Sequence, residues 1–298
     1  MEVNLAPWRY RNALVSDGGP IARIAARRTQ SSFKDRKYEA FAYLDPAFTP
    51  RPDTLLYGKA DGTGSSSSYA EASYKAISEA LERWAFAITI SSPEAARYGF
   101  DRNPTTTGMA AFPGIFRNSP RRIAFNEAVE RWSLCSWWEG KLAATPVHLE
   151  TAEISAIAIN TPWSDRSVVI LYGTTPGGAH CYSFACEKDV LAASRKARIE
   201  YERNFEILEH LSQQASQSVK ITDPFELRLL YFSREPGRSH FNEVLTRSLK
   251  ITSSAPRPAL IVDCDIPGPW SRYASIWRCL FERDEAEALS PRSDYFLF

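Results

Sequence analysis

Residues Tyr57–Phe86, YGKADGTGSSSSYAEASYKAISEALERWAF, contain the pattern around which the rest of the chain is organised. A shorter stretch, Arg121–Gly140, reads RRIAFNEAVERWSLCSWWEG and repeats its central motif. The block EALERW at Glu79–Trp84 returns as EAVERW at Glu127–Trp132. Neither block contains a helix-breaking residue, and Ala, Leu and Glu favour helices. Both blocks are therefore predicted to lie in helices.

Each block places two glutamates at i and i+3 and an arginine at i+4, so the three charged side chains share one helix face. Taken alone, this spacing is typical of a solvated, salt-bridged face. The neighbouring residues indicate otherwise, because apolar residues fill most of the circumference of the first helix. These are Ala76, Ile77, Ala80, Leu81, Trp84 and Ala85. A helix that is apolar nearly all round is predicted to be buried.

Buried carboxylates are costly unless they are paired or bound to a metal. Two such helices could bring Glu79 and Glu82 close to Glu127 and Glu130. These carboxylates would repel one another unless cations lay between them. Hard oxygen ligands suit Mg²⁺, which usually accompanies nucleotide phosphates. Arginines beside them suit phosphate oxygens.

Three blocks of the sequence resemble the nucleotide-binding blocks of the YcaO family. The first comprises Gly58, Lys59, Ala60, Gly62–Gly64, Ala70, Ala76, Glu79, Glu82 and Arg83. The second comprises Glu127, Glu130 and Arg131, and the third comprises Gly177–His180, Ala193, Ala197 and Glu200. The blocks follow the family order, and the resemblance covers roughly residues 57–206.

The resemblance implies an α/β, YcaO-like fold in which mixed sheets pack with helices in a single large domain, residues 1–298. Residues 1–56 would form an N-terminal part, residues 57–211 a nucleotide-binding core and residues 212–298 a C-terminal part. It also implies a site for ATP and Mg²⁺. The metal ligands would be Glu79, Glu82, Glu127 and Glu130, and the ATP-binding residues Lys59, Lys75, Arg83, Arg131 and Glu200. The resemblance assigns no residue as a catalytic acid or base.

The activity that the resemblance implies is ATP-dependent activation of backbone amides in a precursor peptide. A Cys, Ser or Thr side chain would attack the preceding carbonyl, the oxyanion would be phosphorylated, and loss of phosphate would give a thiazoline or oxazoline. Such a cyclodehydratase would work in a homo- or hetero-oligomeric, microcin-like synthetase. Its partners would be a peptide-docking, E1-like subunit and a flavin-dependent dehydrogenase.

Two alternatives stay open. Lys75, Ile123 and Arg203 depart from the family pattern, which favours a non-catalytic scaffold subunit of the same kind of synthetase. A thioamide- or amidine-forming enzyme would use the same site with a different nucleophile.

Composition restricts the class of protein. The chain has 298 residues, 44% of them hydrophobic and 24% charged, with a net charge of +1. These are ordinary values for a globular protein, and the low net charge gives no indication of nucleic-acid binding. The start lacks an apolar signal region, no run is long enough for a membrane span, and the five cysteines form no Cys-x-x-Cys pair. We therefore expect a cytoplasmic protein with reduced thiols.

The remaining elements are predicted from local patterns. Strands are expected at residues 38–44, 142–148, 168–172, 225–232 and 258–266, and helices at 189–211 and 241–249. Residues 58–68 are expected to form a turn, residues 91–120 a surface connection with one short helix, and residues 270–283 a core segment with helical spacing. The basic residues within 1–37 indicate either a solvated surface or a rim that faces phosphate or peptide. His180 is the one histidine within a family-like block, and the aromatic C-terminus is expected to dock on this protein or on a partner.

Overall fold

The computed structural model describes most of the chain. The described residues are 4–31, 33–48, 60–149, 153–213, 221, 223–252, 255–283 and 286–297. They form a mixed α/β structure with three antiparallel sheets, which confirms the predicted fold class at that level. The YcaO-like fold itself stays a prediction.

The chain divides into two compact units. Unit 1 comprises residues 1–128 and 259–282, and unit 2 comprises residues 129–258 and 283–298. Helix α3 (Asn118–Trp138) contributes its first half to unit 1 and its second half to unit 2. Each unit is described by itself below.

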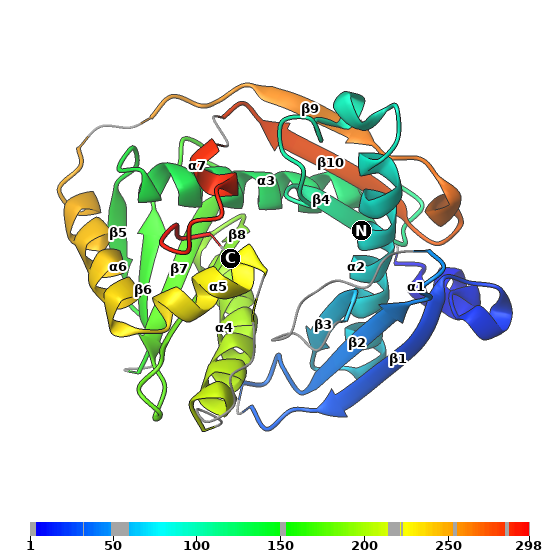
Figure 1. The fold of residues 1–298 in the computed structure, drawn as a ribbon, viewed down its shortest axis with the longest axis horizontal. Helices are drawn as coiled ribbons and strands as arrows, with labels where there is room; N and C mark the ends of the chain where they lie inside the picture. The colour runs from blue at the N-terminus through cyan, green and yellow to red at the C-terminus, as the bar shows by residue number, and fades with distance from the viewer. Residues whose placement is uncertain are drawn as a thin grey trace. The chain divides into compact units, whose positions relative to one another are not determined.

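The first sheet of unit 1 has the strand order β1-β2-β3 (Figure 1). Its strands are β1 (Ile21–Arg28), β2 (Tyr38–Leu44) and β3 (Gly62–Ser66). Helix α2 (Tyr69–Ile90) packs against β2 and β3. The predicted strand at residues 38–44 is confirmed, and so is the helix predicted within residues 57–86.

Two glycines of β3 allow α2 to approach the sheet closely. A Cβ on Gly62 would lie 2.1 Å from the Ala76 carbonyl oxygen, and one on Gly64 would lie 2.1 Å from the Ala72 carbonyl oxygen. Backbone atoms of a helix cannot move aside cheaply, so only glycine fits at these two positions. The turn predicted for residues 58–68 is therefore wrong over β3, because the small residues serve strand-to-helix packing there. Residues 58 and 59 lie outside the described part of the chain.

The second sheet of unit 1 has the order β4-β10-β9. Its strands are β4 (Met109–Phe112), β9 (Leu260–Asp265) and β10 (Ser275–Phe281). Short helices complete the unit: α1 (Ala6–Arg9), η1 (Tyr10–Asn12), η2 (Val15–Asp17), η3 (Ala95–Tyr98) and η4 (Pro269–Arg272). Trp84 and Trp270 meet edge to face in the core, with their ring centroids 5.6 Å apart.

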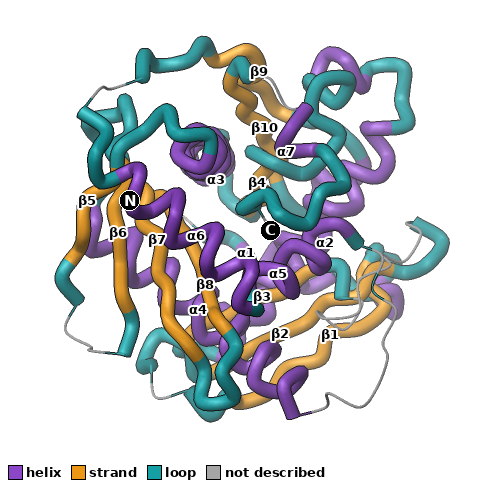
Figure 2. The backbone as a smooth tube through the Cα atoms, turned by 60° about the vertical axis from the view of Figure 1, so that its left-hand side comes forward, coloured by secondary structure: helices purple, strands orange, loops and turns teal. Residues whose placement is uncertain are grey.

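Unit 2 is built on a four-stranded antiparallel sheet whose strands run side by side in Figure 2. They are β5 (Ala144–Val147), β6 (Ser155–Ile159), β7 (Ser167–Thr174) and β8 (His180–Glu187). Helix α4 (Val190–Gln213) packs against β7 and β8. The helices α5 (Pro224–Phe232), α6 (Glu235–Ser248) and α7 (Ala286–Leu289) follow along the chain.

The C-terminal segment docks on unit 2. Phe296 is fully buried, and its ring stacks on Trp138 with the centroids 5.5 Å apart. The buried Arg228 guanidinium of α5 donates to the carbonyl oxygens of four residues near the C-terminus. These acceptors are Ala288, Ser290, Arg292 and Leu297, at 2.6–3.0 Å. The expected docking of the aromatic tail is thus confirmed, and its partner is this protein.

Several predictions of single elements are wrong. Residues 225–232 form a helix, because Asp223 caps it by accepting from the Phe225 and Glu226 N–H groups and Pro224 opens it. Residues 270–283 are a core segment as predicted, but they form η4 and β10. Tyr273, Trp277 and Phe281 recur every four residues, a spacing that fits one face of a helix and also one face of a strand. The predicted surface connection at 91–120 contains β4.

Among the described residues, no helix is both long and apolar enough to span a membrane.

Candidate nucleotide and metal site

The first glutamate of the motif, Glu79, ties α2 to β3. Its Oε2 accepts from the Thr63 N–H at 2.9 Å and from the Thr63 hydroxyl at 3.0 Å. The guanidinium of Arg83 lies 3.6 Å from the other carboxylate oxygen. The expected i,i+4 ion pair between Glu79 and Arg83 is therefore present. Glu79 also accepts a backbone N–H of β3 that does not bond to β2.

Glu82 lies about one helical turn further along α2, and its surroundings differ from those of Glu79. Burial raises the pKa of Glu82 well above its ordinary value, and the Glu127 carboxylate raises it further. Arg83 opposes this shift and Glu79 adds to it, while a hydrogen bond from the Ala111 backbone also lowers the pKa of Glu82. The fold therefore keeps a proton on Glu82 at pH values where an exposed glutamate is ionised.

Within unit 1, the charged groups of Glu79, Arg83 and Glu127 thus lie close enough to Glu82 to change its pKa. This donor set matches the oxygen ligands that Mg²⁺ prefers. The carboxylates are not a preformed metal cage, because no group of three or more His, Cys, Asp or Glu side chains among the described residues is arranged to hold an ion. A cation would have to displace the Glu82 proton and draw the carboxylates together.

The second motif contributes Glu130 and Arg131 to unit 2. The buried Glu130 carboxylate accepts the Cys186 N–H of β8 at 2.9 Å, and the Arg131 Nε lies 3.8 Å from its other oxygen. The Arg131 guanidinium lies over the Phe184 ring, 5.0 Å from its centroid. Glu130 thus anchors the second half of α3 to β8 within unit 2.

The other predicted nucleotide-binding residues lie on different elements. Lys75 donates to the Ser65 carbonyl oxygen at 3.1 Å and pairs with Glu71 at 3.1 Å, so it closes the same edge of β3 as Glu79. Glu200 is half-buried in α4 of unit 2. Lys59 lies outside the described residues. The metal and nucleotide roles assigned to these residues stay predictions.

Two groups that hydrogen-bond to the Glu79 and Glu82 carboxyl groups were not predicted from the sequence. Thr63 was treated as part of a turn, although its N–H and hydroxyl both bind Glu79. The Ala111 backbone reaches Glu82 from β4, a strand that the sequence analysis placed within a loop. The apolar run MAAF at Met109–Phe112 was the one signal for that strand.

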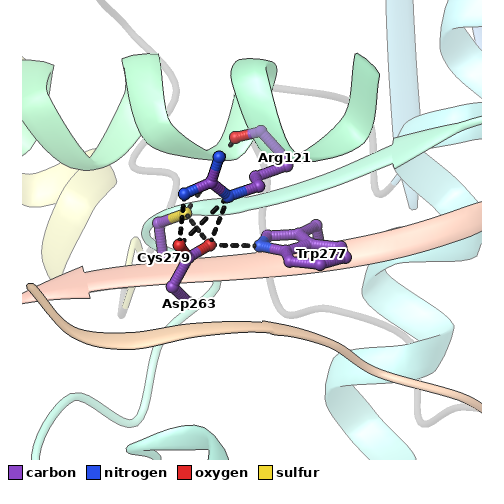
Figure 3. A network of polar contacts seen from close by, with 4 residues as sticks. All are labelled: Arg121, Asp263, Trp277 and Cys279. Carbon is purple, nitrogen blue, oxygen red and sulfur yellow. Dashed lines mark hydrogen bonds and ion pairs between the residues drawn. The ribbon is translucent and has the colours of Figure 1, made fainter. Parts of the chain in front are cut away.

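A separate polar network in unit 1 is drawn in Figure 3. Arg121 of α3 holds the Asp263 carboxylate of β9 through Nε and Nη2 at 2.6–3.0 Å. Trp277 Nε1 donates to the same carboxylate at 2.7 Å, and the Cys279 thiol lies 3.6 Å from it. The Arg121 hydrogen bond lowers the pKa of Asp263, and burial raises the pKa of Cys279. Because these groups satisfy one another, the network fastens α3 to the β4-β10-β9 sheet.

His180, the histidine of the third family-like block, lies at the start of β8. Its Nδ1 is 3.1 Å from the Thr174 hydroxyl, and its Nε2 is 3.4 Å from the Glu235 carboxylate. Burial, followed by the charge of Arg238, lowers the pKa of His180. These contacts join the β7–β8 hairpin to the start of α6.

No protein-family model matches this sequence, and a search of curated proteins gives no significant relative.

Proposed function

We propose that this chain is an ATP- and Mg²⁺-dependent enzyme that activates backbone amides of a precursor peptide. It would cyclodehydrate Cys, Ser or Thr residues to thiazolines or oxazolines within a multiprotein synthetase. The observation that supports this proposal best is that the Glu79 and Glu127 carboxylates lie near enough to the half-buried Glu82 to raise its pKa, together with its burial. The YcaO-like spacing of the same residues gives the proposal its reaction class.

The residues of unit 1 have distinct roles in this proposal. Glu82 and Glu127 are the ligands whose mutual repulsion a divalent cation would relieve. Glu79 is held in place by Thr63 and would serve as a further ligand. Arg83 lies beside Glu79 and would orient phosphate oxygens. Mg²⁺, when bound with ATP, would neutralise the charge that develops on the transferred phosphoryl group.

The proposal makes ATP binding depend on both Mg²⁺ and Glu82. We expect calorimetry on the purified chain to show ATP binding with Mg²⁺ and at least about tenfold weaker binding without it. Glu82→Gln keeps the size of the side chain and removes its charge, so it should abolish the Mg²⁺ dependence. Glu94→Gln changes a carboxylate that is exposed on the same unit and should leave binding unchanged. Equal ATP affinity with and without Mg²⁺ would refute the proposal.

A non-catalytic scaffold subunit is the second candidate function. It is favoured by Lys75, whose ammonium group is engaged by Ser65 and Glu71. It is also favoured by the lack of a preformed metal cage among the described residues. The same titration separates the two candidates, since a scaffold would bind neither Mg²⁺ nor ATP at these glutamates.

The product would separate cyclodehydration from the related chemistry. Loss of water from the peptide indicates ring or amidine formation, whereas exchange of oxygen for sulfur indicates a thioamide. Mass spectrometry of a peptide treated with the complete synthetase would therefore identify the nucleophile.

A further inference from the structure

The two edges of the β1-β2-β3 sheet differ in how their backbone groups are satisfied. In an antiparallel ladder, the backbone N–H and C=O groups of every second residue bond to the partner strand, and those of the residues between them point away from it. The Thr29 N–H donates to the Lys37 carbonyl oxygen at 2.9 Å, next to the pair formed by Arg28 and Tyr38. The odd-numbered residues at this end of β1 therefore bond to β2.

The register of β1 against β2 shifts between Ile21 and Arg23. Beyond that shift, the even-numbered residues of β1 direct their backbone groups to the outer edge. These are Ile24, Ala26 and Arg28, each with one N–H and one C=O. Within the described part of the chain, no strand pairs with this edge beyond the single bridge from Leu14 to Ile21. Figure 1 shows β1 as the outermost strand of its sheet.

The opposite edge, on β3, is closed by side chains of α2. Glu79 accepts the outward N–H of Thr63, and Lys75 donates to the outward carbonyl oxygen of Ser65. Both contacts come from the helix that covers the sheet. Local contacts therefore protect the β3 edge, whereas no strand among the described residues pairs with β1 from Ile24 onward, and such an edge can accept an added strand.

The charge along β1 indicates what kind of chain would fit. Arg23, Arg27 and Arg28 are exposed. Arg27 is paired with the buried Glu39 at 2.7 Å, whereas Arg23 and Arg28 lie near the two ends of the strand, on opposite faces of the sheet. The Arg23 guanidinium lies over the Tyr43 ring, 4.1 Å from its centroid, which fixes its position on the sheet. An extended segment with acidic side chains would complement this edge.

We infer that the free edge of β1 binds an extended acidic peptide segment as a fourth strand of this sheet. Main-chain hydrogen bonds to Ile24, Ala26 and Arg28 would supply affinity, and the arginines would select acidic side chains. The inference rests on the proposed function only in identifying that peptide with the precursor. Binding at the edge itself requires neither ATP nor Mg²⁺.

The test uses a fluorescein-labelled octapeptide of sequence EEVVEEVV, whose glutamates lie on both faces of an extended strand. Binding is followed by fluorescence anisotropy without nucleotide or metal. Ala26→Pro removes an N–H that points outward, where proline is tolerated in an edge strand. The loss of one hydrogen bond should weaken peptide binding about fivefold or more, with little change in melting temperature. Ala25→Pro is the matched control, because it removes a bond to β2 and should lower the melting temperature.

Charge reversal tests the same surface with the backbone intact. The double variant Arg23→Glu with Arg28→Glu should weaken binding by about tenfold or more. The control, Lys188→Glu with Lys250→Glu, makes the same change in net charge at exposed positions of unit 2 and should leave binding unchanged. The inference is overturned if the wild-type chain does not bind the peptide, if folded Ala26→Pro binds it as tightly as the wild type, or if both charge-reversed pairs bind equally.

Failure of this inference is distinguishable from failure of the proposed function. Peptide binding is measured without ATP, and ATP binding is measured without peptide. If the chain binds Mg²⁺ and ATP but not the peptide, the proposed nucleotide site stands and only the inference about the β1 edge is wrong.

Discussion

Glu82 links the chemistry of the candidate site to the stability of the fold. Its pKa is raised in the folded state, chiefly by burial and by Glu127. As pH rises above about 4.3, the unfolded chain loses the Glu82 proton while the folded chain keeps it. The folded state then binds more protons, so its stability falls with rising pH until the raised pKa is passed.

Glu82→Gln should therefore stabilise the metal-free protein near neutral pH. It should also remove a slope of up to about 1.4 kcal/mol per pH unit across that window. Urea unfolding of wild type and variant at several pH values measures the difference, with Glu94→Gln as the control. If the variant is no more stable than the wild type at neutral pH, ionisation of Glu82 does not lower the free energy of unfolding.

Arg228 should be essential for holding the C-terminal segment. Its buried guanidinium donates to four carbonyl oxygens, a pattern that lysine cannot reproduce with one ammonium group. We expect Arg228→Met and Arg228→Lys each to lower the free energy of unfolding by about 2 kcal/mol or more. Arg234→Met, at an exposed position two residues beyond α5, should change it by less than about 0.5 kcal/mol. Equal stability of all three variants would contradict the role of Arg228.

At the scale of secondary-structure elements, the approach of α2 to β3 determines the geometry of the candidate site. Gly64→Ala would place a Cβ 2.1 Å from the Ala72 carbonyl oxygen, so the strand and the helix would have to separate. We expect a loss of about 1–3 kcal/mol in the free energy of unfolding. Weaker Mg²⁺-dependent ATP binding should accompany it, since Glu79 is positioned by this strand. Ser67→Ala, exposed just after β3, is the control and should be neutral in both measurements.

The elements that could be predicted from the sequence are those whose own pattern decides them. The paired motif predicted the helices α2 and α3, and the buried run Val168–Tyr172 predicted part of β7. Strand β3 was missed because its glycines and serines have low strand propensity. Its conformation follows from pairing with β2 and packing against α2. An apolar run such as residues 225–232 fits a buried strand or a helix equally well, and only the Asp223 cap decides for the helix.

The candidate site was predictable in its residue types but not in its contacts. Helical spacing placed Glu79, Glu82 and Arg83 on one face, and the structure gives Glu79 and Arg83 the expected pairing. The contact between Glu82 and Ala111 depends on the β4-β10-β9 sheet, whose strands come from distant parts of the chain. The anchoring of Glu130 to Cys186 likewise depends on the position of β8.

At the scale of the whole molecule, the two units carry different parts of the duplicated motif. Unit 1 contains the clustered carboxylates and the open edge of β1. Unit 2 contains Glu130, Arg131 and Glu200, together with the docked C-terminal segment. In the proposed function, unit 1 would hold the cation and Arg83 would orient the phosphates. In the separate inference, the edge of β1 would bind the peptide.

If a divalent cation binds at Glu82, this carboxyl group has to release its proton, and calorimetry can count the protons released. Mg²⁺–ATP is titrated calorimetrically at pH 6 in two buffers with different ionisation enthalpies. We expect the wild-type chain to release protons on binding and Glu82→Gln to show no such release. Binding by the wild-type chain with the same proton exchange as Glu82→Gln, or no binding at all, would contradict this expectation.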